Sequence, residues 1–301
     1  MEVGQSKLFE YLETLRVKLG PDVNLKSDFA TDYDHKMLSQ EEGEELLQLG
    51  VLKLAEMQDK IYANGHRSVL IIFQAMDAAG KDSAIKHIMT GLNPQGVKVT
   101  SFKVPSHLEL AHDYLWRHYI ALPAAGEIGI FNRSHYENVL VTRVHPEYIS
   151  SESIPGIKNI KDINQKFWDK RFEQIRNFEQ HLCDNGTIVL KFFLHVSKKE
   201  QKKRFVERID NEAKNWKFSI GDLKERSYWK DYQKAYEDML GNTSTKDAPW
   251  FVVPADDKWF TRLSIAGIIY KEFDKLNLQY PKVSADQKAE LEKARAQLLD
   301  E

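Results

Sequence analysis

The fold is decided by the stretch Ser68-Val-Leu-Ile-Ile-Phe-Gln-Ala-Met-Asp-Ala-Ala-Gly-Lys-Asp-Ser83. Its first half is an apolar run rich in β-branched side chains, which is typical of a strand in the middle of a parallel sheet. The loop that follows contains Gly80 and Lys81, and a helix is predicted from Lys81 to about Leu92. This order predicts a phosphate site, because the N–H groups of the loop and of the helix N-terminus attract an anion.

The loop departs from the usual pattern G-x-x-x-x-G-K-[ST], because Ala75 and Asp82 replace the first glycine and the final hydroxyl residue. We still expect phosphate to be held by Ala78, Ala79, Gly80, Lys81, Asp82 and Ser83. Asp77 is unusual, since a carboxylate repels phosphate unless a cation lies between them. Asp77 is therefore predicted to be a Mg²⁺ ligand or a base. The alternative interpretation is a strand–helix turn with a chance Gly-Lys pair.

Strands and helices alternate on both sides of this stretch. Further strands are expected over 97–102, 127–131, 187–196 and 250–254. Helices are expected over 41–63, 108–119, 164–184, 197–211, 223–240, 260–273 and 284–301. The alternation predicts an α/β fold with an open, mostly parallel five-stranded sheet covered by helices on both faces. Ligands of such sheets bind beyond the carboxyl ends of the strands.

A second polar cluster follows the strand predicted at 127–131. Asn132 offers a neutral oxygen ligand where P-loop kinases commonly place a carboxylate, and Arg133 is suited to hold a phosphate through two hydrogen bonds. Glu137 and Asn138 are expected to face a nucleotide or a metal. Alternatively, Asn132 or Ser134 caps a helix N-terminus, and both interpretations are compatible.

The helix predicted at 197–211 is strongly basic. Arg204 and Arg208 lie one turn apart on one face, and we expect them to form a cationic lid over a polyanion. The other basic side chains of the helix are expected to be solvated: Lys198, Lys199, Lys202 and Lys203.

Composition narrows the function classes. The 301-residue chain is 42% hydrophobic and 29% charged with a net charge of −2, so bulk charge favours neither nucleic acid nor membrane as a partner. Cys183 is the single cysteine, which indicates a reducing compartment. No signal peptide and no apolar run of about 20 residues is present, so the expected location is the cytoplasm.

The chain resembles the polyphosphate kinase 2 family, and more closely its class III members. The resemblance runs from about Asp32 to Leu276. It rests on six stretches: Asp77-Ala-Ala-Gly-Lys-Asp82, Phe131-Asn-Arg-Ser-His-Tyr-Glu137, Val141-Thr-Arg-Val-His-Pro146, Lys214-Asn-Trp-Lys-Phe218, Asp222-Leu-Lys-Glu-Arg226 and Ala248-Pro-Trp250 through Pro254-Ala-Asp256.

The resemblance implies a thymidylate-kinase-like P-loop kinase fold in three α/β/α layers with a helical lid. It implies reversible transfer of a phosphoryl group from inorganic polyphosphate to AMP and ADP, making ADP and ATP, with Mg²⁺ or alternatively Mn²⁺. Guanine nucleotides are further candidate acceptors, and a homo-oligomer is expected. The expected organisation is an N-terminal extension (1–40), a kinase domain (41–280) with a lid (197–247), and a C-terminal helix (281–301).

The resemblance also implies roles for single residues. Asp77 and Glu137 are the expected metal ligands, and Glu137 is further expected to set the choice of acceptor. Lys81 and Arg133 would hold phosphate at the reacting centre, with Arg204 and Arg208 acting from the lid. The walls of a polyphosphate channel are expected to include four basic residues: Lys81, Lys86, Lys103 and Arg133. The family's common Asp at the third-strand end is Asn132 here, which puts direct metal ligation at this position in doubt.

Two other functions fit the same loop. One is an ATP-dependent nucleoside monophosphate kinase, which uses ATP instead of polyphosphate as the phosphoryl donor. The other is a non-catalytic nucleotide sensor that binds without turnover.

Overall fold

The computed structural model describes residues 2–20 and 22–301. Its strands are β1 (Ser68–Ala75), β2 (Val97–Ser101), β3 (Ile128–Asn132), β4 (Thr187–His195) and β5 (Trp250–Pro254). Its helices are α1 (Glu2–Thr14), α2 (Leu25–Asp28), α3 (Gln40–Asn64), α4 (Lys81–Ile88), α5 (His107–Leu110), α6 (Trp116–Tyr119), α7 (Glu137–Val144), α8 (Gln165–Asp184), α9 (Lys198–Asp210), α10 (Ile220–Ser227), α11 (Trp229–Thr243), α12 (Lys258–Asp274) and α13 (Ala285–Asp300). Short 3-10 turns are η1 (Pro94–Gly96), η2 (Pro146–Glu152), η3 (Ile160–Asp162) and η4 (Asn215–Lys217).

The five strands form one parallel sheet in the order β2-β3-β1-β4-β5. β1 is the central strand and all of its residues are buried, as its apolar run predicts. In register, Phe73 lies beside Asn132 of β3, and Ala75 lies beside Leu194 of β4. The carboxyl ends of β1, β3 and β4 therefore meet at one edge of the sheet, where the polar motifs follow them.

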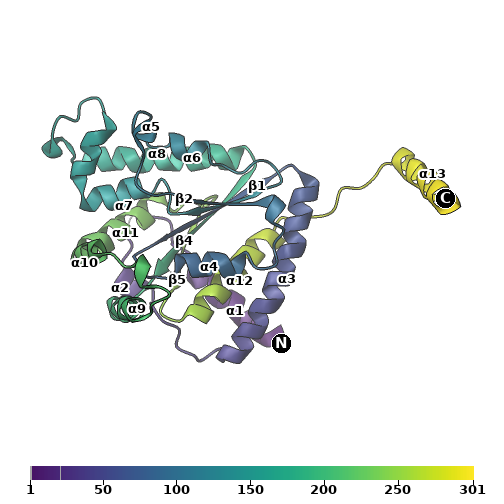
Figure 1. The fold of residues 1–301 in the computed structure, drawn as a ribbon, viewed down its shortest axis with the longest axis horizontal. Helices are drawn as coiled ribbons and strands as arrows, with labels where there is room; N and C mark the ends of the chain where they lie inside the picture. The colour runs from purple at the N-terminus through teal and green to yellow at the C-terminus, as the bar shows by residue number, and fades with distance from the viewer. Residues whose placement is uncertain (1, 21) are drawn as a thin grey trace.

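Helices cover both faces of the sheet (Figure 1). One layer contains α1, α3, α4 and α12, of which α12 packs against the other three helices and against β4 and β5. The other layer contains α7, α8 and α11, which pack against one another, with α8 also on β4. The three-layer α/β/α arrangement predicted from the alternating pattern is confirmed.

The segment before α3 packs into the same core. Leu8, Leu12 and Leu15 are buried, and α1 lies against α12. Beyond α1, the N–H of Val17 donates to the carbonyl of Trp250, and the N–H of Val252 donates to the carbonyl of Leu15. This short pairing covers the outer edge of β5, which would otherwise expose unpaired backbone groups. The expected extension 1–40 thus contributes to the core and to the sheet edge.

Three predicted helices differ from the structure. The helix expected over 108–119 is split into α5 and α6, because the carboxylate of Asp113 accepts the N–H of Leu115 and forms a turn between them. The helix expected over 223–240 is also two helices, since a Ser219 cap starts α10 early and Tyr228 separates it from α11. The helix after the phosphate loop ends at Ile88 rather than near Leu92.

The C-terminal helix α13 projects from the body of the molecule (Figure 1). None of its residues is buried, and an extended segment joins it to α12. Among the described residues, no helix combines the length and apolarity needed to span a bilayer.

Candidate active site

The phosphate loop connects β1 to α4 through residues 76–80. Ala78 and Gly80 have left-handed backbones, with φ of 58° and 104°. Such a backbone costs glycine little but strains alanine, so the loop stores strain at Ala78. Gly80 is the N-cap of α4, and no side chain caps the helix start. The first N–H groups of α4 are therefore available to an anion, as the sequence predicts.

Lys81 lies half-buried at the start of α4. Its ammonium donates to the carbonyl of Ala75 at the end of β1, at 3.1 Å. Burial is the main cause that lowers the pKa of Lys81, and Arg133 adds to it, whereas Asp77 acts in the opposite direction. The influence of Arg133 and Asp77 on Lys81 shows that the structure brings the lysine of the phosphate loop and the arginine after β3 into one site.

The other two polar residues at this helix start are held by protein groups. The amide of Asn132 donates to the Asp82 carboxylate at 2.7 Å, and Arg262 donates to the Ser83 hydroxyl at 2.9 Å. Asn132 thus connects the end of β3 to the helix of the phosphate loop. Its amide ties the two halves of the site together.

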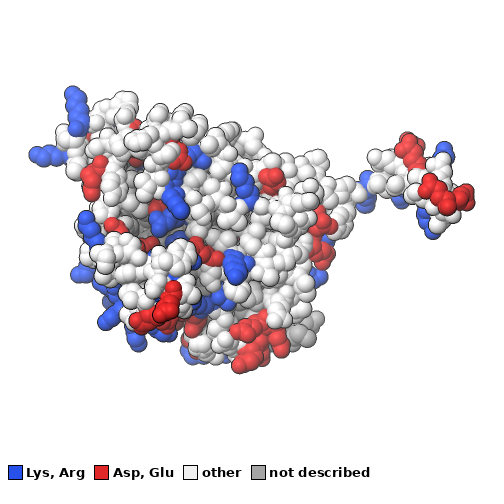
Figure 2. Space-filling view, in the orientation of Figure 1, with Lys and Arg blue, Asp and Glu red and all other residues white. Residues whose placement is uncertain are grey.

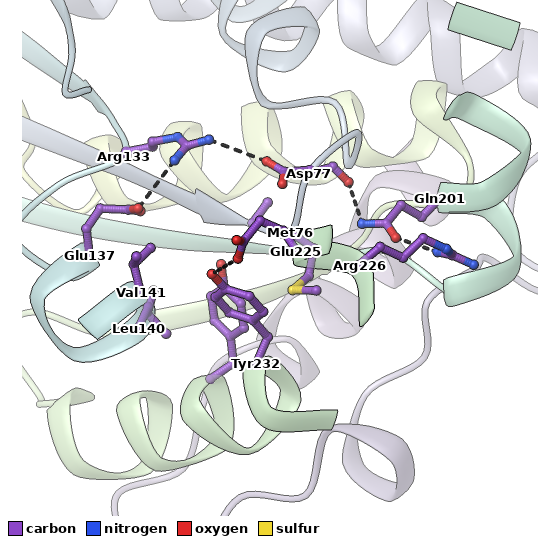
Figure 3. Close-up of a pocket in the computed structure, with 12 residues that line it drawn as sticks. Met76, Asp77, Arg133, Glu137, Leu140, Val141, Gln201, Glu225, Arg226 and Tyr232 are labelled. Carbon is purple, nitrogen blue, oxygen red and sulfur yellow. Dashed lines mark hydrogen bonds and ion pairs between the residues drawn. The ribbon is translucent and has the colours of Figure 1, made fainter. Parts of the chain in front are cut away.

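Arg133 lies between the carboxylates of Asp77 and Glu137, and each ion pair measures 3.4 Å (Figure 3). The backbone of Arg133 is left-handed, with φ of 64°, and its N–H donates to the carbonyl of Phe73 in β1. Glu137 is the main cause that raises the pKa of Arg133, with Asp77 adding to it. A strained, non-glycine backbone at a sheet end is a feature of functional sites, since the surrounding structure must maintain it.

Asp77, Arg133 and Glu137 line a cavity at the carboxyl edge of the sheet (Figure 3). Lys81, Asn132 and the other predicted phosphate-loop residues 78–83 are not among its lining residues. One wall comes from β1 and α7, and the opposite wall comes from α9, α10 and α11. The lining residues that the sequence analysis did not assign are Met76, Leu140, Val141, Gln201, Glu225, Arg226, Tyr232 and Tyr236. Glu225 and Arg226 lie in one of the six family stretches, which was the available signal. The tyrosines lie on a helix that sequence alone describes only as aromatic.

Arg204 differs from its expected place in a lid. Its guanidinium lies behind the phosphate loop and donates to the carbonyls of Ala78 and Ala79 at 3.2 and 2.8 Å. It also donates to the carbonyls of Ala255 and Asp256 and to the Glu200 carboxylate. These acceptors use all five N–H donors of a guanidinium, so none remains for a phosphate.

Gln201 supports the loop from the same face of α9. Its side-chain amide donates to the carbonyl of Asp77 at 2.9 Å. Because the N–H of a trans peptide points opposite to its carbonyl, these contacts turn the N–H groups of Ala78 and Gly80 away from α9. The buried face of α9 thus orients the loop backbone for an anion on the other side.

The remaining predicted residues lie outside the cavity. Arg208 forms an ion pair with Asp222 at 3.7 Å, and burial followed by Asp77 raises the pKa of Asp222. Lys86 and Lys103 are exposed and do not line the cavity. The Asn138 amide donates back to the carbonyl of His135 within its own turn, so it does not face the cavity.

A buried charged network holds the Arg133 turn from behind. The ammonium of Lys191 in β4 donates to the Glu179 carboxylate at 2.6 Å, to the Tyr136 hydroxyl at 2.9 Å and to the carbonyl of Thr243. Tyr136 and His135 also contact Glu179. Burial raises the pKa of Glu179, but Lys191 and His135 outweigh this and hold the carboxyl ionised. No sequence pattern predicts this network, because its residues come from separate elements.

Metal binding by protein groups alone is not indicated. Within residues 2–20 and 22–301, no three His, Cys, Asp or Glu side chains gather as a metal site. Asp77 and Glu137 are nevertheless oxygen donors on either side of Arg133. Mg²⁺ commonly takes one or two carboxylates and completes its shell with water and substrate phosphates, so this donor set fits it.

Comparisons with known proteins agree with the family resemblance seen in the sequence motifs. The family model described as Polyphosphate kinase 2 (PPK2) matches residues 37–281. An ADP-polyphosphate phosphotransferase of Rhodopseudomonas palustris is 50% identical over 284 residues, covering 94% of this chain and 97% of that protein. An AMP/ADP-polyphosphate phosphotransferase of Meiothermus ruber is 47% identical over 229 residues, covering 76% and 80%.

A solved structure shows the same architecture. The crystal structure of polyphosphate kinase 2 from Arthrobacter aurescens TC1 matches with a TM-score of 0.84 and 37% sequence identity, covering 95% of each chain. The resemblance stated from the sequence motifs and the predicted P-loop kinase fold are both confirmed.

Proposed function

We propose, since the chain belongs to the polyphosphate kinase 2 family, that it transfers a phosphoryl group from inorganic polyphosphate to AMP and to ADP. The products are ADP and ATP, and the reaction runs in both directions. The observation that carries this proposal is Arg133 held between Asp77 and Glu137, facing the loop that contains Lys81. Two cations and two carboxylates at a phosphate loop suit the joining of two polyanions.

The chemistry of the step follows from these groups. An oxygen of the acceptor's terminal phosphate forms a bond to the terminal phosphorus of polyphosphate, and the bond from that phosphorus to its bridging oxygen breaks. Negative charge builds up on the oxygens of the transferring group. The backbone N–H groups of the loop, Lys81 and Arg133 supply the positive charge that stabilises it. Gln201 and Arg204 keep the loop in that orientation.

The proposal includes a divalent cation, Mg²⁺ or Mn²⁺. Asp77 and Glu137 would hold it, and it would neutralise phosphate charge so that donor and acceptor can approach. Arg133 contributes separately, because its guanidinium keeps both carboxylates at the mouth of the cavity and limits their mutual repulsion.

The acceptor is proposed to lie in the cavity against α7 and α11. Glu137 lies at the N-terminus of α7 and lines this cavity beside Tyr232 and Tyr236, so it is the group best placed to influence acceptor length. Guanine nucleotides belong to the proposed acceptors as well. A relative from Mycolicibacterium smegmatis, 35% identical over 244 residues and 80% of each chain, is named a GDP-polyphosphate phosphotransferase.

The decisive experiment supplies AMP, Mg²⁺ and polyphosphate without ATP. We expect ADP and then ATP to form, and Lys81→Ala to abolish both. Adding ATP in place of polyphosphate separates the alternatives. Turnover of AMP with ATP alone would establish the nucleoside monophosphate kinase instead, and binding of nucleotide without turnover from any donor would establish the sensor.

A further inference from the structure

A second, larger hollow lies on the other side of α9. It measures about 960 Å³ and runs between α2 with the segment after it, the start of α9, and α11. Four of its lining residues are lysines, and all four are exposed: Lys26, Lys198, Lys230 and Lys234. We refer to this hollow as the lysine groove. On the face shown in Figure 2, Lys and Arg gather at the lower left, around the elements that Figure 1 labels α9 and α10.

The lysines of the groove have no carboxylate partners among the ion pairs of the described residues. Three carboxylates line the same hollow, and one of them is neutralised in an ion pair. Asp238 pairs with Arg143 at 2.7 Å, and Glu237 accepts the N–H of Leu25 at 2.9 Å. A hydrogen bond from a neutral N–H leaves the charge of Glu237 in place, so Glu237 and Asp32 together oppose the four ammonium groups. The groove therefore carries uncompensated positive charge in a chain whose net charge is −2.

Two buried polar atoms in the groove also lack partners. Nδ1 of His195 and Nε2 of Gln233 have no hydrogen bond among the described residues, although both residues line the hollow. His195 is 5% exposed. Burial lowers its pKa to about 4 although hydrogen bonds to the backbone of Phe29 and Ala30 oppose the shift, so the ring is neutral near pH 7 and its one N–H is already engaged. The Gln233 amide is therefore the unpaired buried donor at this place, which is uncommon and favours an acceptor ligand.

The groove adjoins the active-site cavity. Arg226 lines the cavity and donates to the carbonyl of Lys198 at 3.0 Å, while Lys198 lines the groove. Both side chains lie over the ring of Trp229, with the Lys198 nitrogen 5.8 Å and the Arg226 guanidinium carbon 5.9 Å from its centroid. Arg226 of the cavity and Lys198 of the groove are thus direct neighbours.

We propose that the lysine groove binds the part of a long polyphosphate chain that extends away from the reacting centre. The inference rests on the proposed function, because it concerns the same donor. The cavity at the reacting centre measures about 50 Å³, so it accommodates only the end of a polymer and the rest must cross the surface. Arg226 and Lys198 would lead it from the cavity to Lys230, Lys234 and Lys26.

The use of lysine fits this role. An ammonium is a hydrated point charge on a flexible stem, whereas a guanidinium fixes phosphate geometry through two hydrogen bonds. Arg133 at the reacting centre suits a fixed phosphate, and lysines suit a polymer that shifts register after each transfer. Nucleic acid is disfavoured, since base stacking needs an open aromatic face and Lys198 and Arg226 cover Trp229.

The test reverses three exposed charges at once, with Lys26→Glu, Lys230→Glu and Lys234→Glu. The matched control makes the same change at three exposed lysines that do not line the groove, with Lys158→Glu, Lys161→Glu and Lys166→Glu. For the groove variant we expect the KM for long-chain polyphosphate to rise about tenfold or more. The KM for tripolyphosphate, the KM for AMP and kcat should change less than about twofold. The dependence of log KM on log salt should fall by about 2, at about 0.7 per lost phosphate contact.

Direct binding of labelled long-chain polyphosphate, without nucleotide, separates this inference from the proposed function. If the groove variant binds more weakly than both the wild type and the control variant, the groove is a polyphosphate site even if the wild type shows no turnover. Equal binding by wild type and groove variant overturns it, and so does an equal rise in KM for long and short chains. Stronger binding of an RNA oligonucleotide of equal charge would also overturn it, because the groove would then be a nucleic-acid site.

Discussion

The ends of β1 and β3 carry the two halves of the site, and they are held in different ways. The loop after β1 is oriented through its backbone carbonyls by neutral and charged donors from α9. The turn after β3 is oriented from behind by a buried ion pair between Lys191 and Glu179. The phosphate loop is supported by several separate hydrogen bonds, whereas the turn after β3 depends on two charges buried in the core. Removing one partner of the Lys191–Glu179 ion pair should therefore reduce the free energy of unfolding more than removing a hydrogen bond from α9 to the loop.

The largest effect is expected from Lys191→Met. The change leaves the Glu179 carboxylate buried without its cation, which costs about 3–5 kcal/mol in the free energy of unfolding. Denaturant unfolding measures it. The double variant Lys191→Met with Glu179→Leu removes both charges and should recover much of the loss. A double variant no more stable than the single one would contradict the charge argument.

Arg133→Lys should act on catalysis rather than on stability. A lysine keeps one charge but cannot bind a phosphate through a planar pair of donors, so we expect kcat/KM to fall about 10²–10³-fold. The free energy of unfolding should change by less than about 0.5 kcal/mol. Arg176→Lys, which lies on α8 outside the cavity, is the matched control and should keep full activity. A comparable loss in the control would show that the effect is not local.

Arg204→Lys tests the support of the phosphate loop. A lysine has too few donors to serve the four carbonyls that Arg204 serves, so we expect a loss of about 1–3 kcal/mol in the free energy of unfolding and a lower kcat. Because Arg204 has no donor for phosphate, the salt dependence of the polyphosphate KM should not change. A weaker salt dependence of the polyphosphate KM in the variant would show instead that Arg204 contacts phosphate, as expected of a lid residue. Arg208→Lys, one turn away on the same helix, should leave stability unchanged.

The smallest effect concerns His118, which lies buried between Phe102 and the ring of His135. Burial lowers its pKa to about 2, with His135 and Arg117 adding to the shift. Between that value and the ordinary pKa near 6.5, the unfolded chain binds a proton that the folded chain does not, so stability falls as pH falls. At pH 5.5 the cost is about 1.4 kcal/mol.

His118→Phe should remove that part of the acid sensitivity. The variant should also be no less stable at pH 7, because neither ring nitrogen of His118 has a hydrogen-bond partner among the described residues. Unfolding measured at pH 7 and pH 5.5 gives the comparison, and an equal drop for wild type and variant would contradict the assignment.

The features that could be predicted from the sequence are those encoded by short-range patterns of residues. The apolar run of β1 and the Gly-Lys pair after it specify the central strand and the anion site, and the cluster after β3 supplied Arg133 and Glu137. What it could not predict depends on contacts between distant segments. Nothing in the spacing of Arg204 distinguishes a guanidinium aimed at a phosphate from one aimed at carbonyls. The lysines of the groove come from α2, α9 and α11, and only the fold brings them together.

The projecting helix α13 has a practical consequence for immobilisation and fusion. It buries no residue and leaves the body beside α3, on the side away from α9 and α10 (Figure 1). A tag, a surface linker or a second enzyme joined to this helix would therefore leave the cavity and the lysine groove open to the medium. The molecule offers a natural point of attachment for regenerating nucleotides on a solid support.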